Sequence, residues 1–386
     1  HNHFVLDRGG KVFNRSAPVI KLPPEATEDD HLALLGLLNS STAGFWMKQV
    51  FHNKGVGGIG GGIGDEMWEP RYEFDSTKMQ LFPVVANSAR VIPYARQLDT
   101  LARTRAERSV ADLLERMDAH AEAAALKAAM QTRRSRDLQD FMTMVAVQEE
   151  LDWLCYHLYG LDETTDVVAP EEAEPITPNA LPWALLLALN DAPKREAIAR
   201  NEDPGDHPSE WFARHGWDPF LEVPHSLSGT TRKRIEARRA RTASTPALAL
   251  IETATFKRRW FKPDYETEEQ EALRLWLADR VEAEAKTRTR VFTLEHLVAA
   301  LQDDARVLAV CEVLTGRRDF NLATLVGEIL QEEAVPSHPF HLYKPSGLVK
   351  RAAWERTWAD QRREDAGEAV TPQVPPAYGK TDFLRD

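Results

Sequence analysis

The chain has 386 residues, enough for two domains of ordinary size, and its apolar share of 43% is typical of a globular protein. No run of about 18 apolar residues occurs, so we expect no membrane span. The net charge of −12 argues against a protein that coats nucleic acid without selectivity. The start, His1-Asn2-His3-Phe4, lacks an initiator Met and a signal-peptide pattern, which predicts an excised or processed fragment.

The two cysteines, Cys155 and Cys311, lie far apart in apolar helical patterns. They form neither a disulfide framework nor the ligand spacing of a zinc site. We expect both to be buried core residues in a cytoplasmic, reducing compartment.

Residues 1–160 predict a small mixed α/β domain. Residues 4–22 favour two short strands around a turn. Thr27 and Asp30 form a capping-box-like pair that predicts a helix from about residue 27 to about residue 51. Residues 72–85 return to short-strand character.

A glycine-rich stretch at residues 55–64 separates these elements. It lacks the Gly-Lys-Ser/Thr ending of a P-loop and follows a helix rather than a strand, so a phosphate-cradling motif is not indicated. We expect a flexible surface loop. The alternative is a loop that orders against DNA, which the flanking Lys48, Asn53 and Lys54 favour.

Residues 94–160 predict a pair of long antiparallel helices. The first is rich in Ala, Leu, Arg and Glu. A basic break at residues 133–136 separates it from the second, which Gly160 ends as a C′ glycine would. This pattern places Arg133 and Arg134 at the tip of the pair, where they either contact DNA or face solvent.

Residues 161–180 are acidic and Pro-rich, as expected of a linker between domains. Beyond it, residues 181–386 predict an all-α domain. The expected helices lie at 181–190, 226–254, 266–288, 293–301, 304–315, 320–334 and 347–365.

The densest positive charge lies at residues 232–262, with only Glu236 and Glu252 as acidic residues. Such a run in an acidic chain is a candidate phosphate-contacting face. The alternatives are a solvated helix face and a surface that contacts protein. The basic residues are Arg232, Lys233, Arg234, Arg238, Arg239, Arg241, Lys257, Arg258, Arg259 and Lys262.

Catalytic constellations are missing from the sequence. No serine-nucleophile elbow and no zinc-binding His-Glu-x-x-His occurs, and His338 with His341 is too isolated to indicate a metal site. An amino-methyltransferase needs an Asn/Asp/Ser-Pro-Pro-aromatic loop. The nearest segment, residues 374–378, begins with Val and carries an inserted Ala. We expect no catalytic residue, no metal and no cofactor in this chain.

Three motifs nevertheless carry a resemblance. Residues 31–41 resemble the "LLGLLNS" helix of target recognition domains in adenine-specific DNA methyltransferases, residues 77–83 the strand that ends in Phe-Pro, and residues 149–161 the closing "EELD…YxLYGL" helix. Further matches resemble the PglX-like methyltransferases of bacteriophage-exclusion (BREX) systems. They are residues 3–13, 45–50, 52–55, 256–260, 343–348 and 354–358.

This resemblance implies an α+β, predominantly α chain that reads double-stranded DNA. An N-terminal methyltransferase domain of the parent protein would bind S-adenosylmethionine and methylate adenine N6. The other partners implied are further BREX subunits. The expected DNA contacts are Lys48, Asn53, Lys54, Arg71, Lys78, Arg133, Arg134, Arg232, Lys233, Arg234, Arg238 and Arg239.

Two other functions stay open. The helical domain is alternatively a protein-interaction scaffold that recruits defence-system subunits, and a self-contained nuclease is the weaker third idea. Charge reversal at Arg232, Arg234, Arg238 and Arg239 distinguishes DNA recognition from the scaffold role. If the chain recognises DNA, the change should abolish DNA affinity; if it is a scaffold, only partner binding should be lost.

Overall fold

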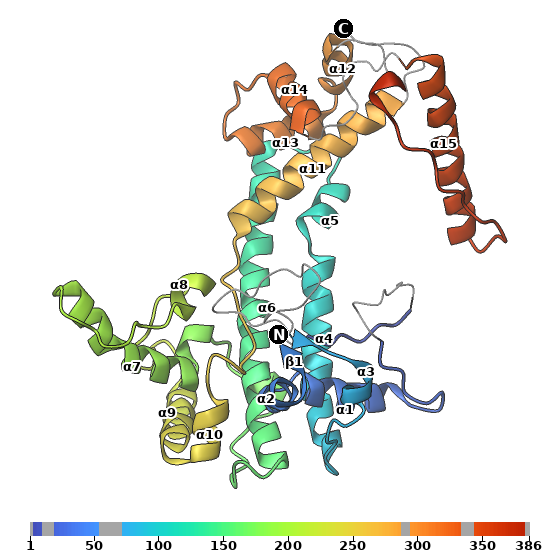
Figure 1. Cartoon of the computed structure of the whole chain (residues 1–386). Coiled ribbons are helices and arrows are strands. Elements are labelled where there is room, and N and C mark those ends of the chain that lie inside the picture. The colour runs from blue at the N-terminus through green and yellow to red at the C-terminus, as the bar shows by residue number, and fades with distance from the viewer. Residues whose placement is uncertain (1–2, 10–18, 54–71, 287–293, 333–342, 383–386) are drawn as a thin grey trace. The chain divides into compact units, whose positions relative to one another are not determined.

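The computed structural model describes residues 3–9, 19–53, 72–286, 294–332 and 343–382 (Figure 1). The fold is predominantly helical, with 64% helix and 1% strand. The chain forms two compact units. The first comprises residues 1–108 and 133–264, and the second comprises residues 109–132 and 265–386.

The first two helices follow their capping residues. Thr27 caps α1 (Glu28–Leu38), and its side chain and that of Asp30 form the predicted capping box. The single helix expected to residue 51 is divided at Asn39, because Ser40 caps a second helix, α2 (Ser41–Val50).

The described residues contain one small sheet, an antiparallel pair of β1 (His52–Asn53) and β2 (Tyr72–Glu73). Residues 3–9 and 19–22 are not strands, and the rest of the expected first hairpin lies outside the described residues. The expected strand at 72–85 stops after β2, because Asp75 caps a short helix, α3 (Ser76–Met79). Within the described residues the mixed α/β character expected of this region is limited to one pair of two-residue strands, so it is not confirmed.

The long helices differ from the expected pair in where they break. After η1 (Ser88–Val91) come α4 (Ile92–Glu107), the short α5 (Val110–Glu115) and α6 (Ala123–Leu158). Residues 133–136 lie inside α6, so the basic run is not a turn. In the first unit α4 and α6 run antiparallel (Figure 1), and Arg105 and Arg108 at the end of α4 pair with Asp137 and Asp140 of α6. Gly160 (φ 72°) ends α6 as predicted.

The expected linker packs within the first unit. Ala173, Ile176 and Ala180 belong to the same core as Leu151 and Trp183, because the segment's apolar residues pack inward. The helices of this region are η2 (Pro170–Glu172), η3 (Pro178–Ala180), α7 (Pro182–Ala199), α8 (Trp211–His215), α9 (Gly229–Ser244) and α10 (Pro246–Ile251). The helix expected at 226–254 is therefore divided before Pro246, which begins α10.

The second unit has its own core, formed by α5, the first turns of α6 and the helices between residues 265 and 332. Its remaining elements are α11 (Tyr265–Lys286), α12 (Leu294–Leu301), α13 (Ala305–Thr315), α14 (Leu322–Glu332), α15 (Pro345–Asp365) and η4 (Lys380–Asp382). The bounds of these α-helices agree with those expected from sequence. Cys155 and Cys311 are buried and unbridged, as expected. None of the described helices has the length and apolarity needed to cross a membrane.

Candidate nucleic-acid interface

The basic run on α9 divides into inward and outward side chains. The buried Arg238 donates to both carboxylate oxygens of Glu150 at 2.9 and 2.7 Å, and its guanidinium lies 5.1 Å from the ring centre of Trp153. Arg234 lies 3.4 Å from Glu150, and Arg241 pairs with Asp162 and Asp166. These three arginines anchor α9 inside the first unit.

Arg234 and Arg238 therefore point toward Glu150 inside the first unit, whereas the sequence indicated a phosphate-contacting face. Arg238 is 2% exposed, so a phosphate cannot reach it without unfolding this part of the unit. Helical periodicity explains the difference. Positions 234, 238 and 241 lie on one face of α9, and that face meets the acidic side of α6. Because these arginines hold α9 through ion pairs, we expect reversal of their charge to destabilise the first unit, so it is not a clean test of DNA binding.

The outward face of α9 carries Arg232, Lys233 and Arg239. Among the described residues Lys233 and Arg239 have no hydrogen-bond or ion-pair partner, and Lys233 is exposed. Arg232 lies near the first turn, where its Nη1 is 2.8 Å from His225 Nδ1. This outward face retains the positive charge that phosphate binding requires.

A second network of buried charges surrounds Lys257 and holds the segment that follows α10. Lys257 Nζ lies 2.8 Å from Glu149, 3.0 Å from Asp152 and 2.8 Å from Glu252, all of them buried. Burial alone would lower the pKa of Lys257, but the three carboxylates hold it well above its usual range. Burial raises the pKa of Glu252 to about 7, and the hydroxyl group of Tyr156 donates a hydrogen bond to the same carboxyl group.

Asp152 also joins this network to α2. Its carboxylate accepts from the backbone N–H of Ser41 at 2.9 Å and from its hydroxyl at 2.6 Å. The motif residues Glu149, Glu150 and Asp152 are thus the internal acidic partners of three different segments. Sequence reasoning assigned them no role, although three acidic residues within the largely apolar stretch at residues 141–158 were the available signal.

Two lysines in the N-terminal part of the chain lie close to aromatic rings. Lys48, on α2, donates to the carbonyl oxygen of Thr255 and lies 5.6 Å from the ring centre of Phe256. Lys78, on α3, lies 3.7 Å from Asp75 and 5.8 Å from the ring centre of Phe51. Both remain partly exposed.

The other expected contacts of this half fall into two groups. Asn53 pairs through its backbone with Tyr72 in the small sheet, while Lys54 and Arg71 lie outside the described residues. On α6, Arg133 is 6% exposed and Arg134 points to the surface. The expected residues that the structure describes therefore belong to five elements, α2, β1, α3, α6 and α9.

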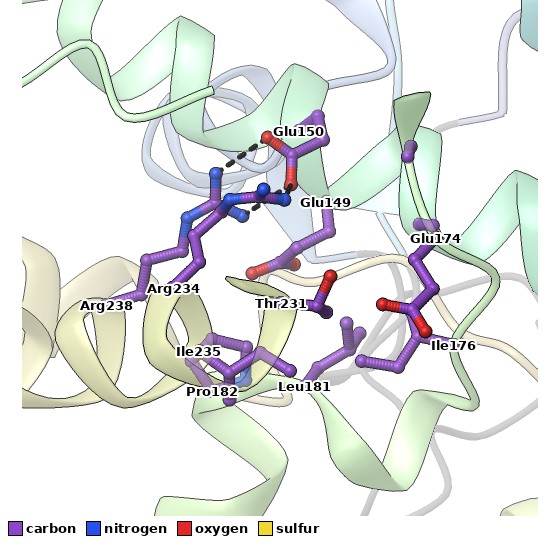
Figure 2. A pocket seen from close by; sticks show the side chains of 12 residues that line it. Glu149, Glu150, Glu174, Ile176, Leu181, Pro182, Thr231, Arg234, Ile235 and Arg238 are labelled. Carbon is purple, nitrogen blue, oxygen red and sulfur yellow. Dashed lines mark hydrogen bonds and ion pairs between the residues drawn. The ribbon is translucent and has the colours of Figure 1, made fainter. Parts of the chain in front are cut away.

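A small cavity lies between α6 and α9, lined by Glu149, Glu150, Glu174, Thr231 and Arg234 among others (Figure 2). Its volume is about 20 Å³, enough for roughly one water molecule. The cavity has no room for a nucleobase or a nucleoside cofactor. No cluster of three potential metal ligands occurs among the described residues.

Comparisons with known proteins identify relatives of the chain. The adenine-specific methyltransferase PglX of Streptomyces coelicolor is 36% identical over 401 residues, which cover 100% of this chain and 32% of that protein. The chain thus spans about a third of this curated relative, and the resemblance indicated by the motifs is confirmed. No solved structure matches. The model of a domain of unknown function, DUF7008, matches residues 144–386. Because that match covers more than half of the chain, the chain belongs to the DUF7008 family.

Proposed function

We propose that this chain is the DNA-recognising part of a site-specific adenine-N6 DNA methyltransferase that acts in bacteriophage exclusion. The observation that carries the proposal is the 36% identity with PglX along the whole chain. In this function the methyl transfer, with S-adenosylmethionine, belongs to another part of the longer protein. This chain holds the duplex and selects the site.

The distribution of positive charge supports the proposal. Although the chain is acidic overall, α9 presents Lys233 and Arg239 outward, without acidic partners among the described residues. Lys48 and Lys78 add partly exposed cations on α2 and α3. Phosphate contacts by such side chains position a duplex, and other side chains read base edges in the major groove.

The test is a salt titration of the purified chain on duplex DNA that contains or lacks the site methylated by the parent enzyme. We expect site-preferring binding with a steep salt dependence. Reversal of both outward charges, Lys233→Glu with Arg239→Glu, should weaken binding. It should also reduce the salt slope by about 0.9 for each phosphate that the variant no longer neutralises.

Two controls sharpen this test. Arg200→Glu changes an exposed arginine at the C-terminal end of α7, which pairs with Glu202 at 3.0 Å, and it should leave the salt slope unchanged. Circular dichroism of each variant checks that the fold is intact. Equal binding to both duplexes, with no effect of the α9 reversal, would contradict the proposal.

A second candidate, a protein-interaction scaffold, is favoured by a different observation. On α15 the large apolar side chains Leu348, Val349 and Trp358 are 53%, 68% and 54% exposed. Exposed apolar groups of this kind are found where proteins bind one another. Substituting the three by Ser should abolish the binding of other defence-system subunits and spare DNA affinity if the scaffold role is correct.

A further inference from the structure

Arg258, in the first unit, is partly buried and yet has no acidic partner among the described residues. It follows Lys257 in a non-helical segment. Within the described part of the chain its guanidinium makes no hydrogen bond and no ion pair. By contrast Arg238, the most buried arginine of α9, is held by both oxygens of Glu150.

The segment around Arg258 is rigidly held. Lys257 is fixed by its three buried carboxylates, and the backbone N–H of Lys262 donates to the carbonyl oxygen of His215 at 2.8 Å. Between them, Trp260 is buried and packs edge-on against Phe141. The Arg258 guanidinium lies 5.1 Å from the centre of the Trp260 ring. A guanidinium held against an aromatic ring keeps its planar fork of N–H donors available.

The surroundings of Arg258 are electropositive. Burial, together with the charges of Arg258 and Arg259, lowers the pKa of His3 from 6.5 to about 4. Burial also lowers the pKa of Arg258 itself. The carboxylate that acts on Arg258 against this effect is that of Asp152, which is already engaged by Ser41 and Lys257. A partly buried cation without a counter-charge is costly, so this place is suited to an anion from outside.

We propose that Arg258 binds a phosphate group through the two-pronged donor pattern of its guanidinium. The geometry of an arginine fork matches two oxygens of a phosphate. Within the proposed function, on which this assignment of the source rests, the phosphate belongs to the backbone of the bound duplex. The same chemistry would also accept a free phosphate ion.

The test compares the wild-type chain with Arg258→Gln, Arg258→Lys and the charge-matched control Arg200→Gln. The first measurement is the melting temperature with and without inorganic phosphate, at constant ionic strength. We expect phosphate to raise the melting temperature of wild type and Arg200→Gln. Arg258→Gln should lose that shift, and Arg258→Lys should keep only part of it, because lysine retains the charge without the fork.

The second measurement is binding of duplex DNA as a function of salt. If the duplex supplies the phosphate, Arg258→Gln weakens binding about tenfold and reduces the salt slope by about 0.9, whereas Arg200→Gln does neither. If phosphate raises the melting temperature only when Arg258 is present, and DNA binding does not change, the site is supported but its ligand is a free phosphate. An identical phosphate response in all four proteins, or no response in wild type, overturns the inference.

Discussion

At the scale of single residues, the side-chain direction along α9 decides what each cation does. Arg238 and Lys233 lie five positions apart in one basic run, yet Arg238 is 2% exposed and Lys233 is exposed. The buried pair Arg238–Glu150 compensates two charges that would otherwise be costly. Both residues are cations in the same stretch of sequence, and their burial differs only because one side of α9 packs against α6.

This difference predicts unequal effects on stability. Arg238→Met leaves the buried Glu150 with the more distant Arg234 as its remaining charged partner, and it should lower the free energy of unfolding by about 3–5 kcal/mol. The control Lys233→Gln should change it by less than about 0.5 kcal/mol. Urea unfolding followed by circular dichroism measures both. Similar values for the two variants would show that Arg238 is not buried in an ion pair.

The buried carboxyl of Glu252 predicts a pH dependence. Its pKa is raised from 4.5 to about 7, first by burial and then by Glu149. Between these values the unfolded chain is ionised at this position while the folded chain keeps the proton. Stability should therefore fall as pH rises from about 4.5 and level off above about 7.

The Glu252→Gln variant tests this dependence, because glutamine does not ionise. The unfolding free energy of the variant minus that of wild type should increase by on the order of 2 kcal/mol from pH 5 to pH 8, because only wild type loses stability over this range. The exposed Glu222→Gln variant is the control and should follow the wild-type curve. A Glu252→Gln curve parallel to wild type would contradict a raised pKa.

At the scale of elements, the resemblance motifs have structural explanations. In the "LLGLLNS" helix, Gly36 faces η1, where a Cβ would lie 2.7 Å from Cγ2 of Val91. The glycine therefore permits the close approach of α1 to the start of α4. The capping box, the helix stop at Gly160 and the later helices could be predicted from sequence, because each depends on neighbours within a few residues.

The close approach at Gly36 can be tested by substitution. Gly36→Ala should lower stability by about 1–3 kcal/mol because the added methyl group overlaps Val91. Gly229→Ala at the start of α9, where an added Cβ meets nothing within 4 Å, is the matched control and should be neutral or slightly stabilising. Combining Gly36→Ala with Val91→Ala should restore part of the stability. Thermal unfolding of the four proteins measures these effects.

At the scale of the whole molecule, each unit is built from two separated stretches of chain. The core of the first unit joins Leu37, Leu151, Ile176 and Trp260, which are far apart in sequence. The second unit likewise combines Leu114 and Leu126 with the helices after residue 265. An acidic, Pro-rich stretch resembles a linker locally, but residues 161–180 lie inside the first unit because their apolar residues fill its core.

This organisation predicts how fragments behave. Fragments 1–160 and 181–386 should both fail to fold independently, because the cut separates Glu150 from Arg238 and Glu149 from Lys257. Circular dichroism, cooperative unfolding and dye binding to exposed apolar surface would show this. Two cooperatively folded fragments at that boundary would instead support an independent first domain of 160 residues.

Local patterns and motifs in the sequence were sufficient to predict the helical character, the bounds of the helices from residue 265 onward, the burial of both cysteines and the resemblance to PglX-like methyltransferases. Which cations are internal depended instead on tertiary packing. Burial of Arg238 depends on Glu150, 88 residues away, and that of Lys257 on Glu149, 108 residues away. Because the partners of such pairs are far apart in sequence, no local sequence pattern predicts them. The same packing left Arg258 without an ion-pair partner among the described residues, which makes it the strongest candidate for binding phosphate.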